Sequence, residues 1–488
     1  MAWSLLFAFC TVHCALALEA GDISKSPTTP WESGKIFGPK DDPVSNLPEL
    51  SRGVPENEPE MGLMELVDVG LENNPSTRSY WNQARSAAYK MYATRSAYYP
   101  TVTLKNTLGF SKATQPAYPG FTSTKQLTDN PALSITYLLL DFGSRAAAAE
   151  AAKQTLFASN FQFNQSIQDT IYNIMNSYYD LDIKQSLVES NIINLKMSDT
   201  TLKQVEVKKK AGLASQTDLY TAIQNQAQAV YTLESSKGDL LTSRATLLKN
   251  VGLPANSKLR VAPPPPLSNL SPLDTQLDNL ILQAMERRPD VAAKVATVLA
   301  KKATARKANA DIWPTISLNL NGQRTFFDAN YSFPPSHYSG ESHYNNYSAS
   351  VVFSVDLFDG FSKLNTARSA RADVESAKAD LAQSELQAIA DVVTNYNNVQ
   401  TAIRKVTSSQ VALEASQVSY DSTSVSYKAG LKTLVDLITA QNNLATSRSQ
   451  NIQARDGLFQ AAVQLTKSTG TLSPKNAAIA SVDPASKP

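Results

Sequence analysis

Few side chains in this sequence could perform catalysis or bind a metal. Its two cysteines, Cys10 and Cys14, lie near the N-terminus, so the remaining chain has no disulfide framework and no thiol nucleophile. Only three histidines are present, and His337 and His343 lie in a segment rich in Tyr, Ser and Pro without a G-x-S-x-G motif. The sequence therefore predicts a protein that is not an enzyme and that uses no cofactor or metal.

Two aspartates are distinguished by their position. Asp218 and Asp436 each follow a glycine, Gly212 or Gly430, by six residues. Glycine tolerates the left-handed conformation that ends helices, so each aspartate falls near the start of the next helix. The helix dipole favours a carboxylate there by about 0.3–1 kcal/mol. On these residues alone, each aspartate is a solvated carboxylate near a helix N-terminus.

Long helices must position these aspartates. The segment Ser144–Ala211 contains no proline, and its 68 residues would form a rod of roughly 100 Å at about 1.5 Å per residue. A second helix is expected from Gly212 to about Asn250, and Gly430 divides Ser362–Ala429 from Leu431–Thr469 in the same way. Large apolar residues form only a narrow stripe, which is typical of coiled coils. We therefore expect a thin wall of helices packed sideways on their neighbours.

Alternating apolar and polar residues predict strands. Four segments of about ten residues have the length of tilted membrane-spanning strands, namely 101–111, 131–141, 315–327 and 346–358. Alternation alone slightly favours a half-buried sheet of a soluble protein. Three charged residues on or near the polar faces are candidates for a channel lining, namely Lys105, Arg324 and Asp356. Four strands cannot close a barrel, and open edges in lipid leave unpaired backbone groups, so several chains would have to pool their strands.

The chain is internally duplicated. Pro75 matches Pro289 and Pro100 matches Pro314, both at an offset of 214 residues. At an offset of 218, LLLDFG matches DLFDG, and KKAGLASQTDLYTA matches YKAGLKTLVDLITA. We therefore divide the chain into the following segments: a signal peptide at 1–17, a flexible segment at 18–60, a first repeat at 61–260, a Pro-rich linker at 261–272, a second repeat at 273–470 and a flexible tail at 471–488. The net charge of +2 and the lack of a polybasic run do not favour nucleic acid as a partner.

Across residues 61–470 the sequence resembles the outer-membrane efflux protein family of TolC/OprM-type exit ducts. The motifs that carry this resemblance are the paired helix–Pro–strand entries, the LFDG turn and the paired AGL-x5-DL turn. The resemblance implies an α+β membrane protein built as a homotrimer. Four strands per chain would pool into a twelve-stranded barrel in the outer membrane, continued by a long α-helical barrel in the periplasm.

The resemblance also implies roles for the residues at the turns. In the family these turns form the periplasmic tips that dock on the adaptor protein, so the expected docking residues are Gly212, Leu213, Gly430 and Leu431. An aspartate that matches Asp436 faces the pore, and three copies would form a cation-binding constriction. Thr439 occupies the place of a second acidic residue that some members carry, which predicts a weaker ring.

A gate lock is implied at the same tips. An aspartate matching Asp218 joins the contacts that close the tube in the family, and Tyr427 and Lys432 resemble its tyrosine and basic partners. We refer to Asp218, Tyr427 and Lys432 as the gate lock. The equivalent first-half positions hold Lys209 and Ala214, so the two copies would divide the gate between them.

The functional expectation is a passive exit duct of a tripartite efflux or type I secretion system. Its implied partners are a periplasmic adaptor, an inner-membrane pump or ABC transporter, and outer-membrane lipid. Efflux of small molecules and export of polypeptides both remain open as cargo classes. The alternative is a structural or adhesive surface coiled coil with a β-barrel anchor, but that architecture predicts one terminal anchor, whereas here the strands are split between two halves.

Overall fold

The computed structural model describes residues 24, 26–29, 60–118, 120–257, 259–264, 276–333 and 336–473. The expected signal peptide and most of the expected flexible segments and linker lie outside the described residues. The helices are α1 (Leu63–Asn73), α2 (Pro75–Arg95), α3 (Ser144–Lys210), α4 (Gln216–Val251), α5 (Leu277–Arg287), α6 (Pro289–Ala310), α7 (Ser362–Lys428) and α8 (Leu434–Ser468), with a 3-10 turn at Ser96–Tyr98. The strands are β1 (Glu60–Met61), β2 (Thr101–Ala117), β3 (Gly120–Leu140), β4 (Arg260–Val261), β5 (Thr315–Phe333) and β6 (Ser336–Ser354).

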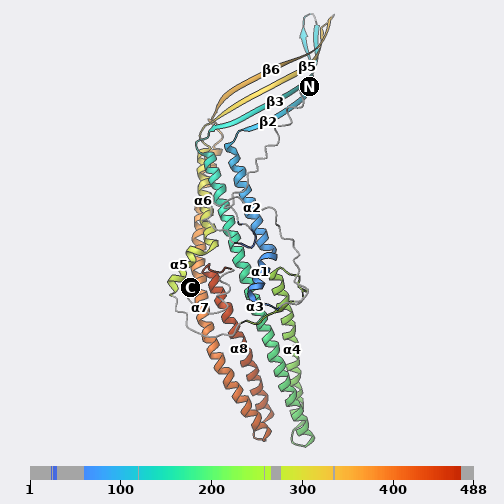
Figure 1. Ribbon diagram of the computed structural model, residues 1–488, viewed down its shortest axis with the longest axis vertical. Coiled ribbons are helices and arrows are strands. Elements are labelled where there is room, and N and C mark those ends of the chain that lie inside the picture. The colour runs from blue at the N-terminus through green and yellow to red at the C-terminus, as the bar shows by residue number, and fades with distance from the viewer. Residues whose placement is uncertain are drawn as a thin grey trace. The chain divides into compact units, whose positions relative to one another are not determined.

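The two repeats fold alike. Both α3 and α7 have 67 residues, α1 and α5 have 11 each, and α4 and α8 have 36 and 35. The long helices predicted from the absence of proline are continuous, and each is followed by its hairpin partner (Figure 1). The predicted apolar stripe of α3 is buried, from Ile171 and Ile174 to Leu181. None of the described helices is long and apolar enough to cross a membrane.

Contacts divide the chain into two compact units that cut across the repeats. We call the first the strand unit; it contains Ser86–Phe157 and Ala296–Ala379, and hence the four long strands. The second, the hairpin unit, contains Ala158–Val295 and Asp380–Pro488, together with Ala17–Arg85. Each repeat contributes residues to both units. The sequence repeats and the packed units are therefore two different divisions of the chain.

In the hairpin unit, both repeats pack the end of their hairpin in the same way. Gly252, after α4, has φ +80°, and a Cβ there would lie 2.8 Å from the backbone of Asn73. Gly470, after α8, has φ +70°, and a Cβ there would lie 2.7 Å from the backbone of Arg287. Each glycine therefore seats the end of a hairpin against the turn before Pro75 or Pro289, which explains why both turns recur.

The four long strands form one antiparallel sheet in the order β2-β3-β5-β6 (Figure 1). All four are longer than the sequence predicted: β2 continues past 111, β3 begins at Gly120 rather than 131, β5 continues past 327 and β6 begins at Ser336 rather than 346. The added portions are mostly polar and lack a regular alternation of apolar and polar residues, so alternation did not mark them. The fourth strand ends at Ser354 rather than 358, because the chain turns before α7.

The LFDG motif turns the chain from strand to long helix. After β3, the Asp141 carboxylate accepts hydrogen bonds from the Arg145 backbone N–H at 2.7 Å and from its Nε at 3.1 Å. Before α7, the Asp359 carboxylate accepts the Lys363 backbone N–H at 2.8 Å. Each aspartate satisfies an amide at a helix N-terminus that has no partner within the helix.

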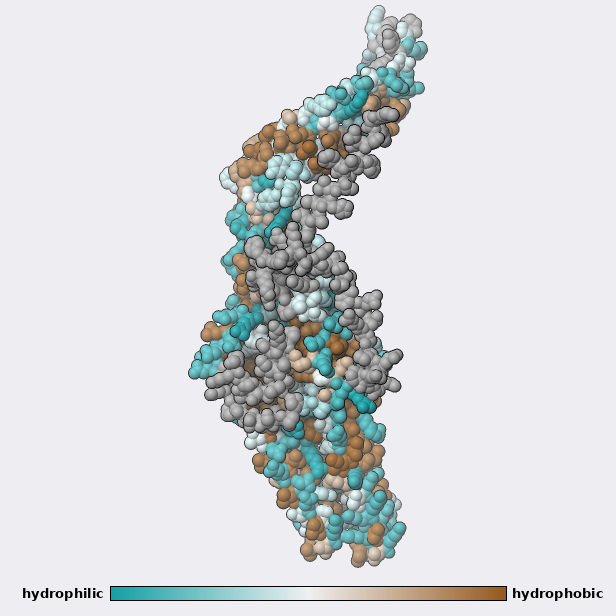
Figure 2. Space-filling model, in the orientation of Figure 1, coloured by the Kyte–Doolittle hydropathy of each residue, from teal (hydrophilic) through white to brown (hydrophobic). Residues whose placement is uncertain are grey.

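One face of the sheet is apolar and exposed. Val102, Leu104, Leu108 and Phe110 of β2 are 61–71 % exposed, far more than ordinary core residues. Register places Leu104 opposite Leu133, and Leu318 of β5 opposite Val351 of β6, on that same face. We call this face the apolar face. Hydrophobic side chains gather over the part of the strands nearer the helices, with hydrophilic ones beyond (Figure 2).

Two charged residues predicted for a channel lining lie elsewhere. Arg324 shares the parity of Leu318 on β5, so it lies on the apolar face, where its guanidinium stacks 4.7 Å from the Phe326 ring centroid. Asp356 lies after β6 and forms an ion pair of 2.8 Å with Lys363. The prediction was wrong for Arg324, because continuing the alternation of β5 from Leu318 places Arg324 on the same face as Leu318. Lys105 does lie on the polar face.

Candidate functional site at the hairpin tips

The turns between the paired helices have nearly identical geometry. Gly212 and Gly430 have φ values of +71° and +79°. The Leu213 amide donates to the Lys208 carbonyl at 2.8 Å, and the Leu431 amide donates to the Ser426 carbonyl at 2.9 Å. These are Schellman-type helix ends, which use glycine for its left-handed conformation. The prediction of a glycine C-cap is confirmed at both turns.

The turns present a leucine to solvent. Leu213 and Leu431 are 77 % and 80 % exposed, among the most exposed large apolar side chains of the described chain. Each is held at a fixed position by its own backbone hydrogen bond in the turn. Each tip therefore presents one apolar side chain in a defined position. Within the described part of the chain, both side chains remain largely uncovered.

Asp218 and Asp436 complete capping boxes. Asp218 Oδ2 accepts hydrogen bonds from the Ser215 hydroxyl at 2.7 Å and the Ser215 amide at 2.9 Å. Asp436 Oδ2 accepts from the Thr433 hydroxyl at 2.9 Å and the Thr433 amide at 3.0 Å. In return, each aspartate amide donates to the hydroxyl. Both carboxylates thus start their helices by reciprocal bonding.

These bonds favour the ionised carboxylates. Hydrogen bonds from the Ser215 side chain and backbone lower the pKa of Asp218. Bonds from the Thr433 backbone and side chain lower the pKa of Asp436, with a further contribution from the charge of Lys432. Both groups therefore carry negative charge at neutral pH at the exposed tips.

Tyr427 is the buried member of the gate lock. It is 5 % exposed and packs in a cluster with Val205, Ala222, Leu434 and Leu437. Burial raises the pKa of Tyr427, and the charge of Asp218 raises it further. The Tyr427 phenol is therefore close enough to feel the charge of the Asp218 carboxylate. The hydrogen bonds that the Asp218 carboxylate accepts come from Ser215.

Lys208 is a contact that the sequence did not predict. Its ammonium lies 3.8 Å from the centroid of the Tyr427 ring and donates a hydrogen bond of 2.9 Å to the Tyr427 carbonyl. This cation–π contact joins α3 to α7 at the tips. The signal available in the sequence was the basic run Lys208–Lys210 in the last turn of α3. Lys432, in contrast, acts electrostatically on Asp436.

Behind the tips, α3 and α8 pack antiparallel along a polar seam. Asp169 bonds Lys467 at 2.8 Å, Tyr179 stacks on Phe459 at 4.9 Å, and Gln441 donates to Ser198 at 2.8 Å. The same register places Asp182 of α3 against Asp456 of α8, and Asp456 is 2 % exposed. We call this contact the α3–α8 seam.

Of the two carboxyls in the seam, that of Asp456 is buried and that of Asp182 is half-buried. Burial raises the pKa of Asp456 to about 7, the charge of Asp182 adds to this increase, and Arg455 opposes it. Burial also raises the pKa of Asp182, with Arg455 lowering it and Glu189 raising it. The seam therefore holds a proton more tightly than an ordinary carboxylate does.

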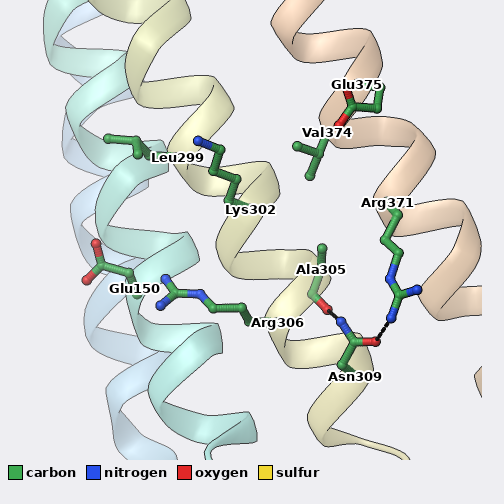
Figure 3. A pocket seen from close by; sticks show the side chains of 9 residues that line it. All are labelled: Glu150, Leu299, Lys302, Ala305, Arg306, Asn309, Arg371, Val374 and Glu375. Carbon is green, nitrogen blue, oxygen red and sulfur yellow. Dashed lines mark hydrogen bonds between the residues drawn. The ribbon is translucent and has the colours of Figure 1, made fainter.

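A separate groove lies within the strand unit, between α6 and α7 and beside α3 (Figure 3). Its volume is about 550 Å³. Asn309 donates to the Ala305 carbonyl and accepts from Arg371, each at 2.8 Å. Its lining is Glu150, Leu299, Lys302, Ala305, Arg306, Asn309, Arg371, Val374 and Glu375. This set mixes both charges and includes no Ser, Cys or His nucleophile or base, so it supports no hydrolytic triad.

The remaining residues with catalytic potential are dispersed. His337 and His343 both lie on β6, and His343 is 6.0 Å from the Phe326 ring. Among the residues that the structure describes, no group of three or more His, Cys, Asp or Glu side chains could hold a metal ion. The tips and the apolar face are thus the features that call for a functional explanation.

Comparison with known proteins agrees with this architecture. The family model described as "Outer membrane efflux protein" matches residues 66–253 and 280–471. Protein CyaE of Bordetella pertussis is 26 % identical over 413 residues, covering 85 % of each chain. The pyoverdine export outer membrane protein OpmQ of Pseudomonas aeruginosa is 26 % identical over 378 residues, covering 75 % of this chain and 76 % of OpmQ.

Solved structures share the fold. The outer-membrane channel OprN superposes with a TM-score of 0.73 at 20 % identity, covering 84 % of this chain and 90 % of OprN. The CmeC outer membrane channel of Campylobacter jejuni superposes with a TM-score of 0.72 at 14 % identity, covering 86 % of this chain and 89 % of CmeC.

Proposed function

Because this chain belongs to the outer membrane efflux protein family, we propose that three copies of it form one continuous duct with a gate at the hairpin tips. The protein is the Gram-negative outer-membrane exit duct of a tripartite efflux or secretion system, with its helical part in the periplasm, and it is not an enzyme. It works with an adaptor and an inner-membrane pump that drives transport. The proposal concerns its assembly, its gate and its cargo.

The open edges of the sheet are the observation that carries the proposed assembly. Strands β2 and β6 are the outermost strands of the four-stranded sheet, and each lacks a neighbour on one side within the described chain. In lipid, each unpaired backbone group costs several kcal/mol. A barrel needs about eight strands or more, so the edges must pair with other copies. Three copies supply twelve strands, as the family resemblance implies.

The helices offer surfaces for the same neighbours. Val411, Val418 and Val425 recur every seven residues along α7 and are 63–67 % exposed. Tyr231 and Leu241 of α4 are also exposed, at 72 % and 68 %. Apolar residues at heptad spacing are typical of a coiled-coil contact. These faces support sideways packing of copies into a helical barrel.

The tips support two roles in the proposed duct. The exposed Leu213 and Leu431 beside Gly212 and Gly430 provide apolar groups that an adaptor would cover. An ionised Asp436 at each of three tips would form a ring of negative charge that binds and selects cations. The proximity of the Asp218 charge to buried Tyr427 supports a lock that involves both.

Small molecules are the first cargo class to test. OpmQ is named for the export of pyoverdine, and this similarity favours small-molecule efflux over polypeptide export as a starting hypothesis. Uptake of a fluorescent drug by cells that lack the gene, compared with complemented cells, measures this class directly. Equal accumulation in both strains, with a functional partner pump present, would favour polypeptide cargo.

Conductance tests the proposed gate. Asp218→Ala or Tyr427→Ala should loosen the contacts between hairpins and raise single-channel conductance severalfold in a planar bilayer. Glu414→Ala is the matched control, because Glu414 lies on α7 and accepts a hydrogen bond of 3.0 Å from its neighbour Gln410 on the same helix. Unchanged conductance in both gate variants would count against the lock, whereas an equal rise in the control would indicate a general loosening of α7.

A further inference from the structure

The sheet carries a basic recess near its hairpin ends. Lys112 of β2, Lys125 of β3 and His337 of β6 line it, together with hydroxyl and amide side chains. Its volume is about 490 Å³, and the other lining residues are Ser123, Asn330, Ser332 and Ser339. None of these lining residues is acidic. We call this cluster the basic recess.

Strand register places the basic recess on the apolar face. Lys112 lies directly opposite Lys125, and the next pair on the same face, toward the helices, is Phe110 and Leu127. Successive side chains on one face are about 7 Å apart along a strand. The two ammonium groups therefore begin one such step beyond the exposed apolar residues, where a lipid-facing surface meets its polar boundary.

The direction of the strands determines which boundary this is. β2 joins β3 beyond Ala117, and β5 joins β6 beyond Phe333, so both hairpins lie at the end of the sheet that carries the basic recess. The opposite ends of the strands lead into α3 and α7. Because the helical part is periplasmic, the hairpin ends lie toward the outside of the cell. The basic recess then lies at the level of the outer-leaflet headgroups.

The two lysines of the basic recess lie directly opposite each other, with two carboxylates in the adjoining row of the same face. Like charges directly opposite each other on neighbouring strands are destabilising. Within the described residues, neither Lys112 nor Lys125 forms an ion pair. The carboxylates nearest in register on this face are Asp328 and Glu341. They lie opposite each other in the row of Phe110 and Leu127, where Asp328 is paired with Leu127, one step along the strand from Lys125. An anion from outside the chain would offset the repulsion between the lysines.

We propose that the basic recess binds the phosphate groups of an outer-leaflet lipid. The two ammonium groups donate to phosphate oxygens, and the serine hydroxyls complete the hydrogen bonding. The adjoining Phe110 and Leu127 contact the acyl chains, which favours a lipid over free phosphate. This inference rests on the outer-membrane location of the protein and is independent of its gate and its cargo.

Lipid binding to the purified full-length protein tests the proposal. Native mass spectrometry of the protein in detergent, titrated with bisphosphorylated lipid A, should show bound lipid, and dephosphorylated lipid A should bind at least tenfold more weakly. Each basic residue near an anionic headgroup contributes about fivefold to affinity. The double variant Lys112→Ala/Lys125→Ala should therefore lose roughly 25-fold.

Two control variants separate recognition from a change in fold. Lys105→Ala removes the same charge from the polar face of the same strand and should bind lipid A as the unmodified protein does. Lys112→Arg/Lys125→Arg keeps both charges and should retain binding within about threefold. Unchanged heat resistance in each variant shows that the barrel is intact.

Three results would overturn the proposal. One is equal affinity of the unmodified protein for phosphorylated and dephosphorylated lipid A, a comparison that needs no variant. Another is undiminished binding by the Lys112→Ala/Lys125→Ala protein. The third is displacement of the lipid by millimolar inorganic phosphate, which would assign the recess to a free anion instead.

Discussion

At the residue scale, Asp218 and Asp436 share one local role in different surroundings. Both close capping boxes, with Ser215 and Thr433, so their equivalence in the repeat is structural. Only Asp218 acts on a buried tyrosine, Tyr427, and only Asp436 has a lysine, Lys432, as its electrostatic neighbour. The asymmetry of the proposed gate therefore comes from the different charged and aromatic neighbours of each aspartate.

Some of these residue contacts could be predicted from the sequence and others could not. The glycine turns, the exposed leucines and the helical aspartates follow from local propensity and spacing. The contact of Lys208 with Tyr427 joins residues 219 positions apart, so it depends on how α3 packs against α7. No local pattern encodes that packing, and a basic run at a helix end has an ordinary explanation in the helix dipole.

A pH dependence follows from Asp456 in the α3–α8 seam. Its pKa rises from 3.8 to about 7 on folding, so between these values the folded chain holds a proton that the unfolded chain lacks. The contribution of Asp456 to the free energy of unfolding is therefore complete at low pH and declines as the pH rises toward 7. Burial is the main cause of the raised pKa of Asp456, the charge of Asp182 on the facing helix raises it further, and the neighbouring Arg455 lowers it.

Asp456→Asn should remove this dependence, because asparagine keeps the shape and stays neutral. At pH 8 the variant should be more stable by about 1–2 kcal/mol, or a few degrees in Tm, and near pH 4 it should match the unmodified protein. Thermal unfolding of both proteins in detergent from pH 4 to pH 8 measures the difference. Asp239→Asn, at an exposed carboxylate on α4, is the control. Parallel pH profiles of the Asp456→Asn and unmodified proteins would contradict this account.

At the element scale, the sequence predicted the helices better than the strands. A run of 67 residues without proline predicts a long helix. The LFDG turn marks the start of each long helix, and Gly212 or Gly430 marks its end. The sequence predicted only the part of each strand in which apolar and polar residues alternate, as they do where one face of a strand contacts lipid. Their outer portions, such as the pair Thr114 and Ser123, are mostly polar and are held by backbone pairing, which leaves no periodic signal.

The seating of the hairpins on the entry turns gives an element-scale prediction. Gly252→Ala places a Cβ 2.8 Å from the Asn73 backbone and also strains φ, whereas Gly212→Ala strains φ in open space. We expect Gly252→Ala to lower the free energy of unfolding by about 2–4 kcal/mol and Gly212→Ala by about 1 kcal/mol. Thermal unfolding of the two variants provides the comparison. Equal losses would show that contact with the entry turn contributes nothing.

At the scale of the whole molecule, the duplication explains why one chain is not enough. Each repeat supplies two strands, and the four together leave β2 and β6 with open edges. Each repeat also supplies one helical hairpin, with exposed apolar residues at heptad spacing on α7. The same sequence feature thus builds a sheet that cannot close alone and a wall that needs neighbours. The number of copies was predicted from the family resemblance, because neither repeat length nor strand count alone distinguishes three copies from two.

Single-channel recording on the purified, unmodified protein tests this account most directly. The mass of the detergent-solubilised particle, measured in parallel by light scattering, should correspond to three chains. In a planar bilayer these particles should give discrete steps of small, cation-selective conductance, because the proposed gate narrows the duct at the tips, which carry Asp436. A monomeric particle without conductance would contradict the central claim that copies of this chain pool their strands into one duct.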